Sequence, residues 1–294
     1  MKASFIGLGR MGGHMARRVL LNKLPLGVYN RNQEKAKPLA ADGAEVFSSP
    51  RDAYRDAELF ITMVSNDFAL NSLTTPQDLT LMAPGGVHVS MSTISVELSD
   101  ALTALHASLG QAFVSCPVFG RPLAAEAGTL NLCLAGPQDA KAKAAPYLAT
   151  MGKIFDFGLK PSGANSVKLA GNFMLATLIE MLSEAFSLVD KHGVTPLSFF
   201  DLISTTNFSA PAVKIYGQLL LDNSFGPGGF SAALGAKDIG LVKAAAKNSL
   251  TPMPLASTLE DRFLRILARG WEDKDWCVLG QIQKEDSGLA KPSV

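Results

Sequence analysis

The stretch from Ser166 to Val189 is apolar and has the periodicity of a helix, yet it carries a lysine, Lys168, and an amide, Asn172, four residues later. Residues four apart lie on one helical face, so the ammonium and the amide project together. Lysine is among the side chains that transfer protons in enzymes, and a charge in an apolar helix needs a reason. Lys168 is therefore the first candidate for a catalytic residue; the alternative is a lysine that snorkels out of a buried helix.

A glycine-rich loop follows the short apolar run Ser4 to Ile6 and precedes a helical pattern. The first two glycines of such a loop permit a tight turn and the close approach of a pyrophosphate to the backbone. The third lets the helix pack on the strand while the helix N-terminus faces the anion. The loop reads Gly7, Leu8, Gly9, Arg10, Met11, Gly12. Because this loop lies between a strand and a helix, it predicts dinucleotide binding rather than an ordinary glycine-rich turn. A dinucleotide site together with Lys168 predicts a redox enzyme.

The residues after the second expected strand bear on which dinucleotide is bound. An NAD-binding protein places an acidic residue about 20 positions after the loop to hold the ribose hydroxyls, and Val28 to Asn32 contains none. Asn30 can hydrogen-bond the ribose, Arg31 can pair with a 2′-phosphate, and Lys35 adds positive charge. We therefore expect NADPH to be preferred over NADH; in the alternative, Arg31 and Lys35 are solvated charges on a surface turn.

In the first half of the chain, β-rich runs alternate with helical patterns, and these elements hold the glycine loop and the residues after the second strand. This alternation is typical of βαβ units, so we expect an α/β, doubly wound, mostly parallel sheet of Rossmann type over residues 1–161. The expected strands are Ala3 to Ile6, Gly27 to Asn30, Ala44 to Phe47, Glu58 to Val64, Gly86 to Ser90, Ala112 to Pro117, Leu130 to Leu134 and Lys153 to Phe157, with helices such as Gly12 to Leu21 and Val96 to Leu109.

After Ser162 the pattern contains no convincing strand. A long helix carrying Lys168 is expected over 162–190, followed by an all-α domain over 191–294 that ends in a short polar tail from Lys284 to Val294. The further expected helices are Leu197 to Ile203, Pro211 to Leu221, Ala232 to Lys247 and Ala256 to Arg269.

Composition narrows the class of protein. The 294 residues carry 27 Lys and Arg against 26 Asp and Glu, so no global basic field exists to hold nucleic acid or anionic lipid, and a small-molecule partner is expected. Three cysteines without tight spacing argue against a disulfide framework and against a metal site. The apolar run in the first residues is too short for the core of a signal peptide, and we expect no membrane-spanning segment. We therefore expect a cytoplasmic protein.

Five sequence blocks in order resemble the β-hydroxyacid dehydrogenase family, which includes the 3-hydroxyisobutyrate dehydrogenases and the glyoxylate and succinic semialdehyde reductases. The blocks are GLGRMGGHMA with the following NR, SMSTIS from Ser90, SCPVFGRP from Ser115, the pair Lys168 and Asn172, and LGAKDIGLV from Leu234. The resemblance spans nearly the whole chain. It implies an NADP-dependent dehydrogenase or reductase that transfers hydride between NADP(H) and a small aldehyde, oxo acid or β-hydroxy acid.

The resemblance also implies roles for individual residues. Lys168 matches the catalytic general acid and base, and Asn172 matches the residue that orients substrate and lysine. The residues implied at the cofactor, besides the glycine loop, Asn30, Arg31 and Lys35, are Met63, Val64, Ser65, Thr93 and Lys237. The residues implied at the substrate are Ser92, Thr93, Phe119, Gly120, Arg121, Lys168, Asn172, Phe230 and Asp238. A site between the two domains is expected.

Two departures from the family pattern concern the substrate. The family loop usually reads Asp-Ala-Pro-Val-Ser-Gly-Gly, whereas the corresponding run here ends Val118-Phe119-Gly120-Arg121. The hydroxyl is lost, Phe119 makes the pocket more apolar, and we hypothesise that Arg121 binds an acid group. The glycines usual before the lysine are reduced to one, Gly163.

Two other functions stay open, and an oligomer is expected. Imine reductases resemble the family in fold and cofactor loop but typically lack the lysine, so Lys168 counts against imine reduction while Phe119 suits an uncharged amine substrate. A non-catalytic dinucleotide-binding protein is disfavoured by the intact Lys168 and Asn172. The few charges between Phe173 and Val189, together with the resemblance, predict a homodimer or homotetramer.

Overall fold

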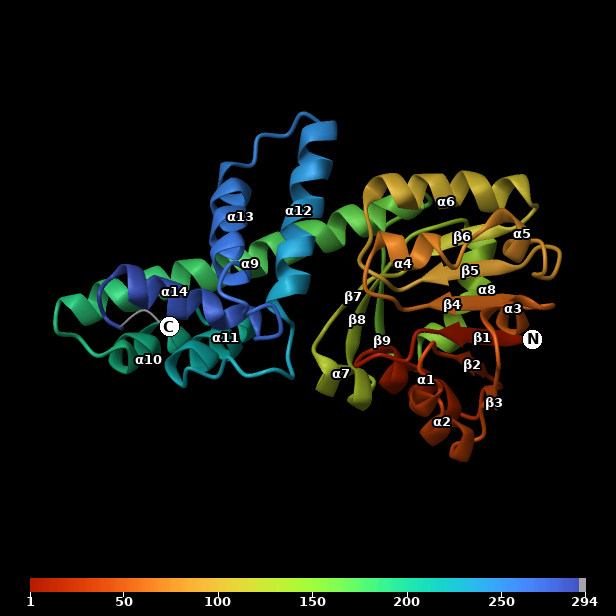
Figure 1. The fold of residues 1–294 in the computed structure, drawn as a ribbon, viewed down its shortest axis with the longest axis horizontal. Helices are drawn as coiled ribbons and strands as arrows, with labels where there is room; N and C mark the ends of the chain where they lie inside the picture. The colour runs from red at the N-terminus through yellow and green to blue at the C-terminus, as the bar shows by residue number, and fades with distance from the viewer. Residues whose placement is uncertain (291–294) are drawn as a thin grey trace. The chain divides into compact units, whose positions relative to one another are not determined.

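The computed structural model describes residues 1–290, and the chain divides into two compact units, Met1–Lys168 and Leu169–Val294. The first unit contains a six-stranded parallel sheet in the order β3-β2-β1-β4-β5-β6 (Figure 1). Its strands are β1 (Ala3–Ile6), β2 (Gly27–Tyr29), β3 (Glu45–Val46), β4 (Leu59–Thr62), β5 (Val87–Ser90) and β6 (Ala112–Ser115). The strand order reverses at β1, and the carboxyl ends of strands beside such a reversal are where open α/β sheets bind ligands.

A smaller sheet of three strands completes the first unit. Strand β7 (Val118–Phe119) pairs antiparallel with β8 (Leu130–Leu134), which pairs parallel with β9 (Gly152–Asp156). Strand β7 was not predicted, because two residues after a proline give no periodicity. The helices of this unit are α1 (Gly12–Leu21), η1 (Gln33–Lys35), α2 (Lys37–Ala41), α3 (Pro50–Tyr54), α4 (Asp67–Asn71), α5 (Pro76–Leu79), α6 (Val96–Ser108), α7 (Pro122–Ala127) and α8 (Gln138–Leu148).

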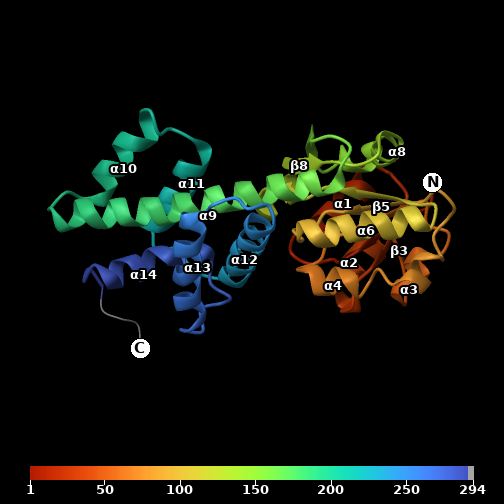
Figure 2. The ribbon, with the colours of Figure 1, turned by 90° about the horizontal axis from the view of Figure 1, so that it is seen from above.

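Helix α9 (Pro161–Lys191) is continuous over 31 residues; it begins in the first unit and continues from Leu169 in the helical second unit. The other helices are α10 (Pro196–Thr205), α11 (Pro211–Leu221), α12 (Ala232–Asn248), α13 (Pro254–Leu267), η2 (Trp276–Val278) and α14 (Leu279–Asp286). Helices α10 and α11 lie on one side of α9, with α13 and α14 on the other (Figure 2). The parallel sheet followed by a helical unit confirms the predicted fold class.

The C-terminal segment differs from its prediction. Helix α14 includes Lys284, which was assigned to a polar tail, because the apolar side chains of Leu279 and Ile282 anchor the helix in the core of the second unit. The last four residues of that predicted tail, 291–294, lie outside the described residues. Helix α9 is long and apolar enough to span a membrane, but this is weak evidence, because core helices of soluble proteins meet the same criteria.

A buried ion pair joins α9 to α13 in the second unit. Arg262 Nε lies 2.6 Å from Glu180 Oε1, and the two side chains are 11% and 8% exposed. Burial raises the pKa of Glu180 to about 7, although the neighbouring Arg262 guanidinium opposes the rise. Breaking such a pair by removing one partner leaves a buried charge and is strongly destabilising.

A chain of buried hydrogen bonds crosses the first unit from β4 to α6. Gln111 Nε2 donates to the Leu79 carbonyl at 2.7 Å, so its oxygen accepts from His106 Nδ1 at 2.9 Å. His106 Nε2 then accepts from His88 Nδ1 at 2.9 Å, and His88 Nε2 accepts from the Thr62 hydroxyl at 2.9 Å. With these donors and acceptors both imidazoles are neutral, since His106 Nε2 and His88 Nε2 each accept a hydrogen bond.

Acid should therefore weaken the first unit. Burial lowers the pKa of His106 to about 4 and that of His88 well below its ordinary value. Histidines in the unfolded chain take up protons near pH ~6.5, so the unfolded state binds more protons below that pH. The stabilisation is present above pH ~6.5 and is lost towards the folded pKa, by roughly 2–3 kcal/mol for His106 between pH 7 and 4.5.

Urea unfolding across this pH range measures the loss. The double variant His88→Phe/His106→Leu should flatten the pH dependence, whereas His192→Gln, at an exposed position, should leave it unchanged. An unchanged slope in the double variant would show that other groups cause the acid sensitivity.

Candidate active site

The glycine loop connects β1 to α1, and its three glycines are required for different reasons. Gly7 has φ +100°, and a Cβ there would lie 2.2 Å from the Met63 carbonyl oxygen; a Cβ on Gly12 would lie 1.9 Å from the Gly7 oxygen. A Cβ on Gly9 would meet no atom within 4 Å. Packing therefore explains Gly7 and Gly12, while the open space over Gly9 fits close approach of a ligand backbone such as a pyrophosphate. Helix α1 begins there without a side-chain cap, and although the Gly13 N–H donates to the Gly9 carbonyl at 3.1 Å, the positive end of the helix dipole still favours an anion at this position.

Asn30 has a role in the loop that the sequence did not indicate. Its Oδ1 accepts a hydrogen bond from the Leu8 N–H at 2.8 Å, and its Nδ2 donates to the Asn32 carbonyl at 2.9 Å. The side chain therefore fixes the conformation of the glycine loop, and contact with a ribose stays a prediction. Arg31 and Lys35 follow β2 as exposed cations.

The carboxyl ends of β4 and β5 are joined through Ser92. The Ser92 hydroxyl is fully buried and accepts a hydrogen bond from the Val64 N–H at 2.8 Å. This contact holds the segment Met63 to Ser65 beside Ser92 and Thr93, so the structure brings together the predicted residues of two strand ends. Ser92 thereby fixes backbone geometry, whether or not it also contacts a substrate.

Lys168 is 8% exposed, and its ammonium lies over the ring of Phe119, with Nζ 4.0 Å from the ring centroid. The aromatic face attracts the cation and holds the side chain in place. The buried thiol of Cys133 on β8 also lies within the field of this ammonium. Burial raises the pKa of Cys133, and the charge of Lys168 opposes that rise. Phe119 was predicted to wall the substrate pocket, but its contact with Lys168 was not predicted.

The loop after Phe119 requires a glycine at position 120. Gly120 has φ +143°, and a Cβ there would lie 2.5 Å from Leu130 Cδ2, so a larger residue is excluded. Arg121 is partly buried at the N-terminal boundary of α7, where its carbonyl accepts the first helical hydrogen bonds. Its predicted contact with an acid group stays a prediction.

The second unit brings together Asn172, Asp238 and Lys237. The amide of Asn172 donates to Asp238 Oδ2, and Lys237 Nζ lies 2.8 Å from Asp238 Oδ1. Asp238 is 1% exposed, so its carboxylate fixes both the amide and the lysine from within the core. Phe230 packs its ring against Trp276, with centroids 4.6 Å apart.

Two neighbours of Lys168 were missed as site residues. Cys133 gave no signal, because its closeness to Lys168 depends on the pairing of the second sheet. Asn165 gave a weak signal, since it lies three residues before Lys168 and therefore on the same face of α9. Among residues 1–290, no cluster of three or more His, Cys, Asp or Glu side chains could hold a metal ion, and the three cysteines are free and buried.

Comparison with known proteins agrees with this arrangement. Residues 2–164 match the family described as the NAD binding domain of 6-phosphogluconate dehydrogenase, and residues 163–280 match the NAD-binding domain of NADP-dependent 3-hydroxyisobutyrate dehydrogenase. An uncharacterised oxidoreductase of Bacillus subtilis, YfjR, is 40% identical over 95% of this chain and 98% of its own length. The NAD-dependent L-serine dehydrogenase of Pseudomonas aeruginosa is 31% identical, over 95% of this chain and 96% of its own.

A solved structure with a similar sequence has the same fold over nearly the whole chain. The 3-hydroxyisobutyrate dehydrogenase of Mycobacterium tuberculosis, determined with L-serine, is 28% identical and superposes with a TM-score of 0.87 over 96% of this chain and 98% of that one. The chain therefore belongs to the β-hydroxyacid dehydrogenase family of NAD(P)-dependent oxidoreductases, which act on the CH–OH group of β-hydroxy acids.

Proposed function

We propose that the protein is an NADPH-dependent reductase of small aldehyde or oxo acids that also oxidises the corresponding β-hydroxy acids. The observation that carries this proposal is the buried ammonium of Lys168, held over Phe119 four residues before Asn172. The dinucleotide supplies or accepts the hydride. The protein supplies the charge and the proton.

Lys168 acts on the oxygen of the reacting carbon. In reduction, its ammonium stabilises the developing alkoxide and donates a proton to it; in oxidation, the neutral amine removes the hydroxyl proton. The Phe119 ring attracts the ammonium and limits the rotamers of the side chain. Asp238 accepts a hydrogen bond from the Asn172 amide and so fixes the orientation of that side chain on the helix that carries Lys168.

Turnover against a panel of substrates tests the proposal. NADPH oxidation is measured with glyoxylate, succinic semialdehyde and methylmalonate semialdehyde, and NADP⁺ reduction with L-serine and 3-hydroxyisobutyrate. Turnover of at least one substrate that bears a carboxylate is expected. Dinucleotide binding without turnover of any of them would instead support a non-catalytic protein.

The preference for NADPH rests on Arg31 and on the absence of an acidic residue directly after β2. An exposed guanidinium can form charge-assisted hydrogen bonds to a 2′-phosphate, which NADH lacks. Arg31→Ala should weaken NADPH binding by roughly 10–100-fold, since hydrogen bonds to charged groups contribute ~1.5–3 kcal/mol, and should leave NADH binding unchanged. Lys37→Ala, which removes an exposed lysine paired with Glu34 at 2.8 Å, is the control. Equal affinity of the unaltered protein for NADH and NADPH would reject the preference.

Imine reduction is the second candidate, because Phe119 gives this part of the pocket an apolar wall suited to an uncharged amine. Lys168 counts against it, since an ammonium disfavours a cationic iminium. Including cyclic imines in the panel separates the two: imine turnover that survives loss of Lys168 would favour this candidate.

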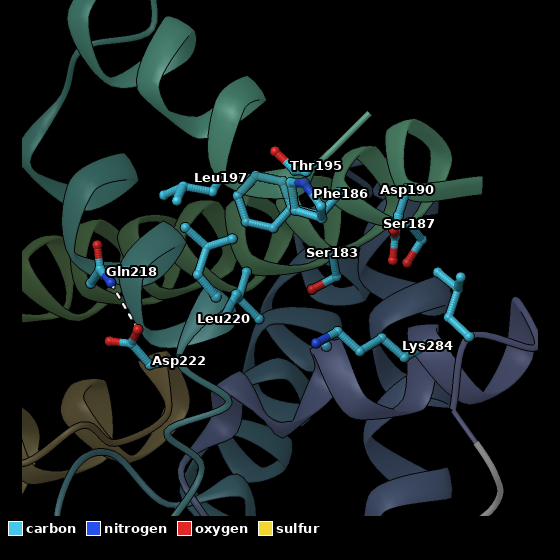
Figure 3. A pocket seen from close by; sticks show the side chains of 14 residues that line it. Ser183, Phe186, Ser187, Asp190, Thr195, Leu197, Gln218, Leu220, Asp222 and Lys284 are labelled. Carbon is cyan, nitrogen blue, oxygen red and sulfur yellow. Dashed lines mark hydrogen bonds between the residues drawn. The ribbon is translucent and has the colours of Figure 1, made fainter. Parts of the chain in front are cut away.

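We further propose that two copies of the chain associate through the helical unit. Met174, Met181 and Leu188 are 68%, 49% and 62% exposed and recur every seven residues on α9, so they form one apolar stripe. On the opposite face of α9 lies a cavity of about 440 Å³, whose lining includes Ser183 and Ser187 (Figure 3). Its wall includes Phe186, with Leu197 from α10 and Leu220 from α11. We infer that the helical unit of a second copy covers the stripe.

Disruption of the stripe should dissociate the oligomer. Met181→Glu combined with Leu188→Glu is expected to convert a dimer or tetramer into a monomer in sedimentation velocity at micromolar concentration. Leu21→Glu, at a position 57% exposed in the first unit, should not change the mass. A monomeric unaltered protein would disprove the association.

A further inference from the structure

Asn165 is a buried amide whose hydrogen-bonding groups are not used by the protein. The residue is 1% exposed, and neither Oδ1 nor Nδ2 has a hydrogen-bond partner within residues 1–290. A buried amide without partners costs free energy, so most buried side-chain amides in proteins are bonded. A group that both accepts from and donates to Asn165 would remove this cost.

Asn165 lies one helical turn before Lys168, on the same face of α9. Side chains three residues apart have Cβ atoms about 5–6 Å from each other. The first turns of α9 pack on β8 and Phe119, since Ala164 and Val167 share a cluster with Cys133, Ala135 and Phe119. The two side chains therefore flank one position on the inner side of the helix.

The geometry of hydride transfer requires the carboxamide of the nicotinamide to lie near the position between Asn165 and Lys168. If Lys168 serves the oxygen of the reacting carbon, C4 of the nicotinamide must lie against that carbon at about 3–3.5 Å. The carboxamide is attached to C3, the neighbouring ring atom. It therefore lies within a few bonds of the atom that Lys168 serves, which is about the separation of one helical turn.

We propose that Asn165 binds the nicotinamide carboxamide through a paired amide–amide contact, in which Nδ2 donates to the carboxamide oxygen and Oδ1 accepts from its NH₂. A carboxamide is the group that matches an unpartnered donor and acceptor on one planar side chain. A substrate carboxylate offers acceptors only and would leave Oδ1 without a partner. The contact selects the face and rotation of the ring presented to the substrate, and it rests on the function proposed above.

Binding measurements test the contact independently of turnover. Dissociation constants are measured for the preferred dinucleotide, for its 3-acetylpyridine analogue, which lacks the carboxamide NH₂, and for the adenosine fragment that lacks nicotinamide. Asn165→Leu should weaken binding of the dinucleotide by roughly 10–100-fold, as for loss of two hydrogen bonds to a neutral group. It should leave the adenosine fragment unaffected and abolish the preference for carboxamide over acetyl.

Thermal unfolding without ligand gives a second readout. An unpartnered amide replaced by a leucine of similar size should leave the melting temperature equal or higher, whereas an amide that supports the fold would lower it. Asn165→Asp keeps the size of the side chain and an acceptor for the carboxamide NH₂ but loses the donor to the carbonyl oxygen, so it should weaken binding of both dinucleotides and keep the discrimination between carboxamide and acetyl. Ser166→Ala, on the exposed side of the same turn, is the control.

Several outcomes overturn the proposal. Unchanged discrimination in Asn165→Leu would show that the amide does not contact the carboxamide. Equal weakening of dinucleotide and adenosine fragment would show a general loss of structure, and a higher KM with unchanged dinucleotide binding would place the substrate there instead. Failure of the unaltered protein to bind any dinucleotide would reject the proposed function together with this contact.

Discussion

Lys168→Ala should lower kcat by about 10²–10⁴-fold, the range that positioned acid–base groups contribute, while the affinity for the dinucleotide changes little. The ammonium is the positioned charge that Phe119 holds, and its removal takes away both the proton donor and the charge opposite the developing alkoxide. Steady-state kinetics with the best substrate of the panel measures the effect. Equal losses in kcat and in kcat/KM would show that the interaction forms in the transition state.

A matched substitution shows whether the loss is specific to the site. Lys160→Ala removes a lysine that is 72% exposed and pairs with Asp100 at 3.2 Å, close to the start of the same helix. Its kcat should equal that of the unaltered protein. Retention of kcat in Lys168→Ala would mean that another group transfers the proton, and the mechanism would have to be abandoned.

Alanine at two glycines of the same loop should give opposite results. Gly9→Ala places a Cβ where the protein has no atom within 4 Å, so the melting temperature should not change. The added methyl group would occupy the space through which a pyrophosphate approaches the backbone, and we expect dinucleotide affinity to fall at least roughly tenfold, or ~1.4 kcal/mol.

Gly12→Ala should instead destabilise the first unit. Its Cβ would lie 1.9 Å from the Gly7 carbonyl oxygen, which is backbone and cannot rotate away. Helix α1 would have to move from β1, at a cost of roughly 3 kcal/mol or more. Thermal unfolding and a binding titration of both variants separate the two effects; tight dinucleotide binding by Gly9→Ala would remove the loop from the proposed site.

The parallel sheet was predictable because its strands are short β-rich runs between helical stretches, and parallel strands are buried on both faces. The expected strands from Ala3 and from Leu130 have the predicted bounds, the strand expected from Lys153 begins and ends one residue earlier, and the others shorten by one to three residues. Strand β7 was missed because it has two residues, and α14 because its polar residues outnumber its anchoring side chains.

The site was predictable only where one segment carries the signal. The glycine loop and the spacing of Lys168 and Asn172 are local patterns. In the structure the loop forms the junction between β1 and α1, and the two residues lie on the single helix α9. Contacts across the fold were not predictable: Asn30 with Leu8, Ser92 with Val64 and Phe119 with Lys168 join residues from 22 to 49 positions apart. Their pairing depends on strand order and on side-chain orientation, which composition and periodicity do not specify.

The buried carboxyl of Glu180 has a consequence for calorimetry of the helical unit. With its pKa near 7 in the folded protein and an ordinary value after unfolding, this group is partly protonated at neutral pH when folded and ionised when unfolded. Unfolding at neutral pH therefore releases a fraction of a proton to the medium from this one side chain. The buffer takes up the released proton, so the heat of unfolding includes a contribution from the ionisation enthalpy of the buffer. Heats measured in phosphate and in an amine buffer therefore differ by that fraction of the difference between the ionisation enthalpies of the two buffers.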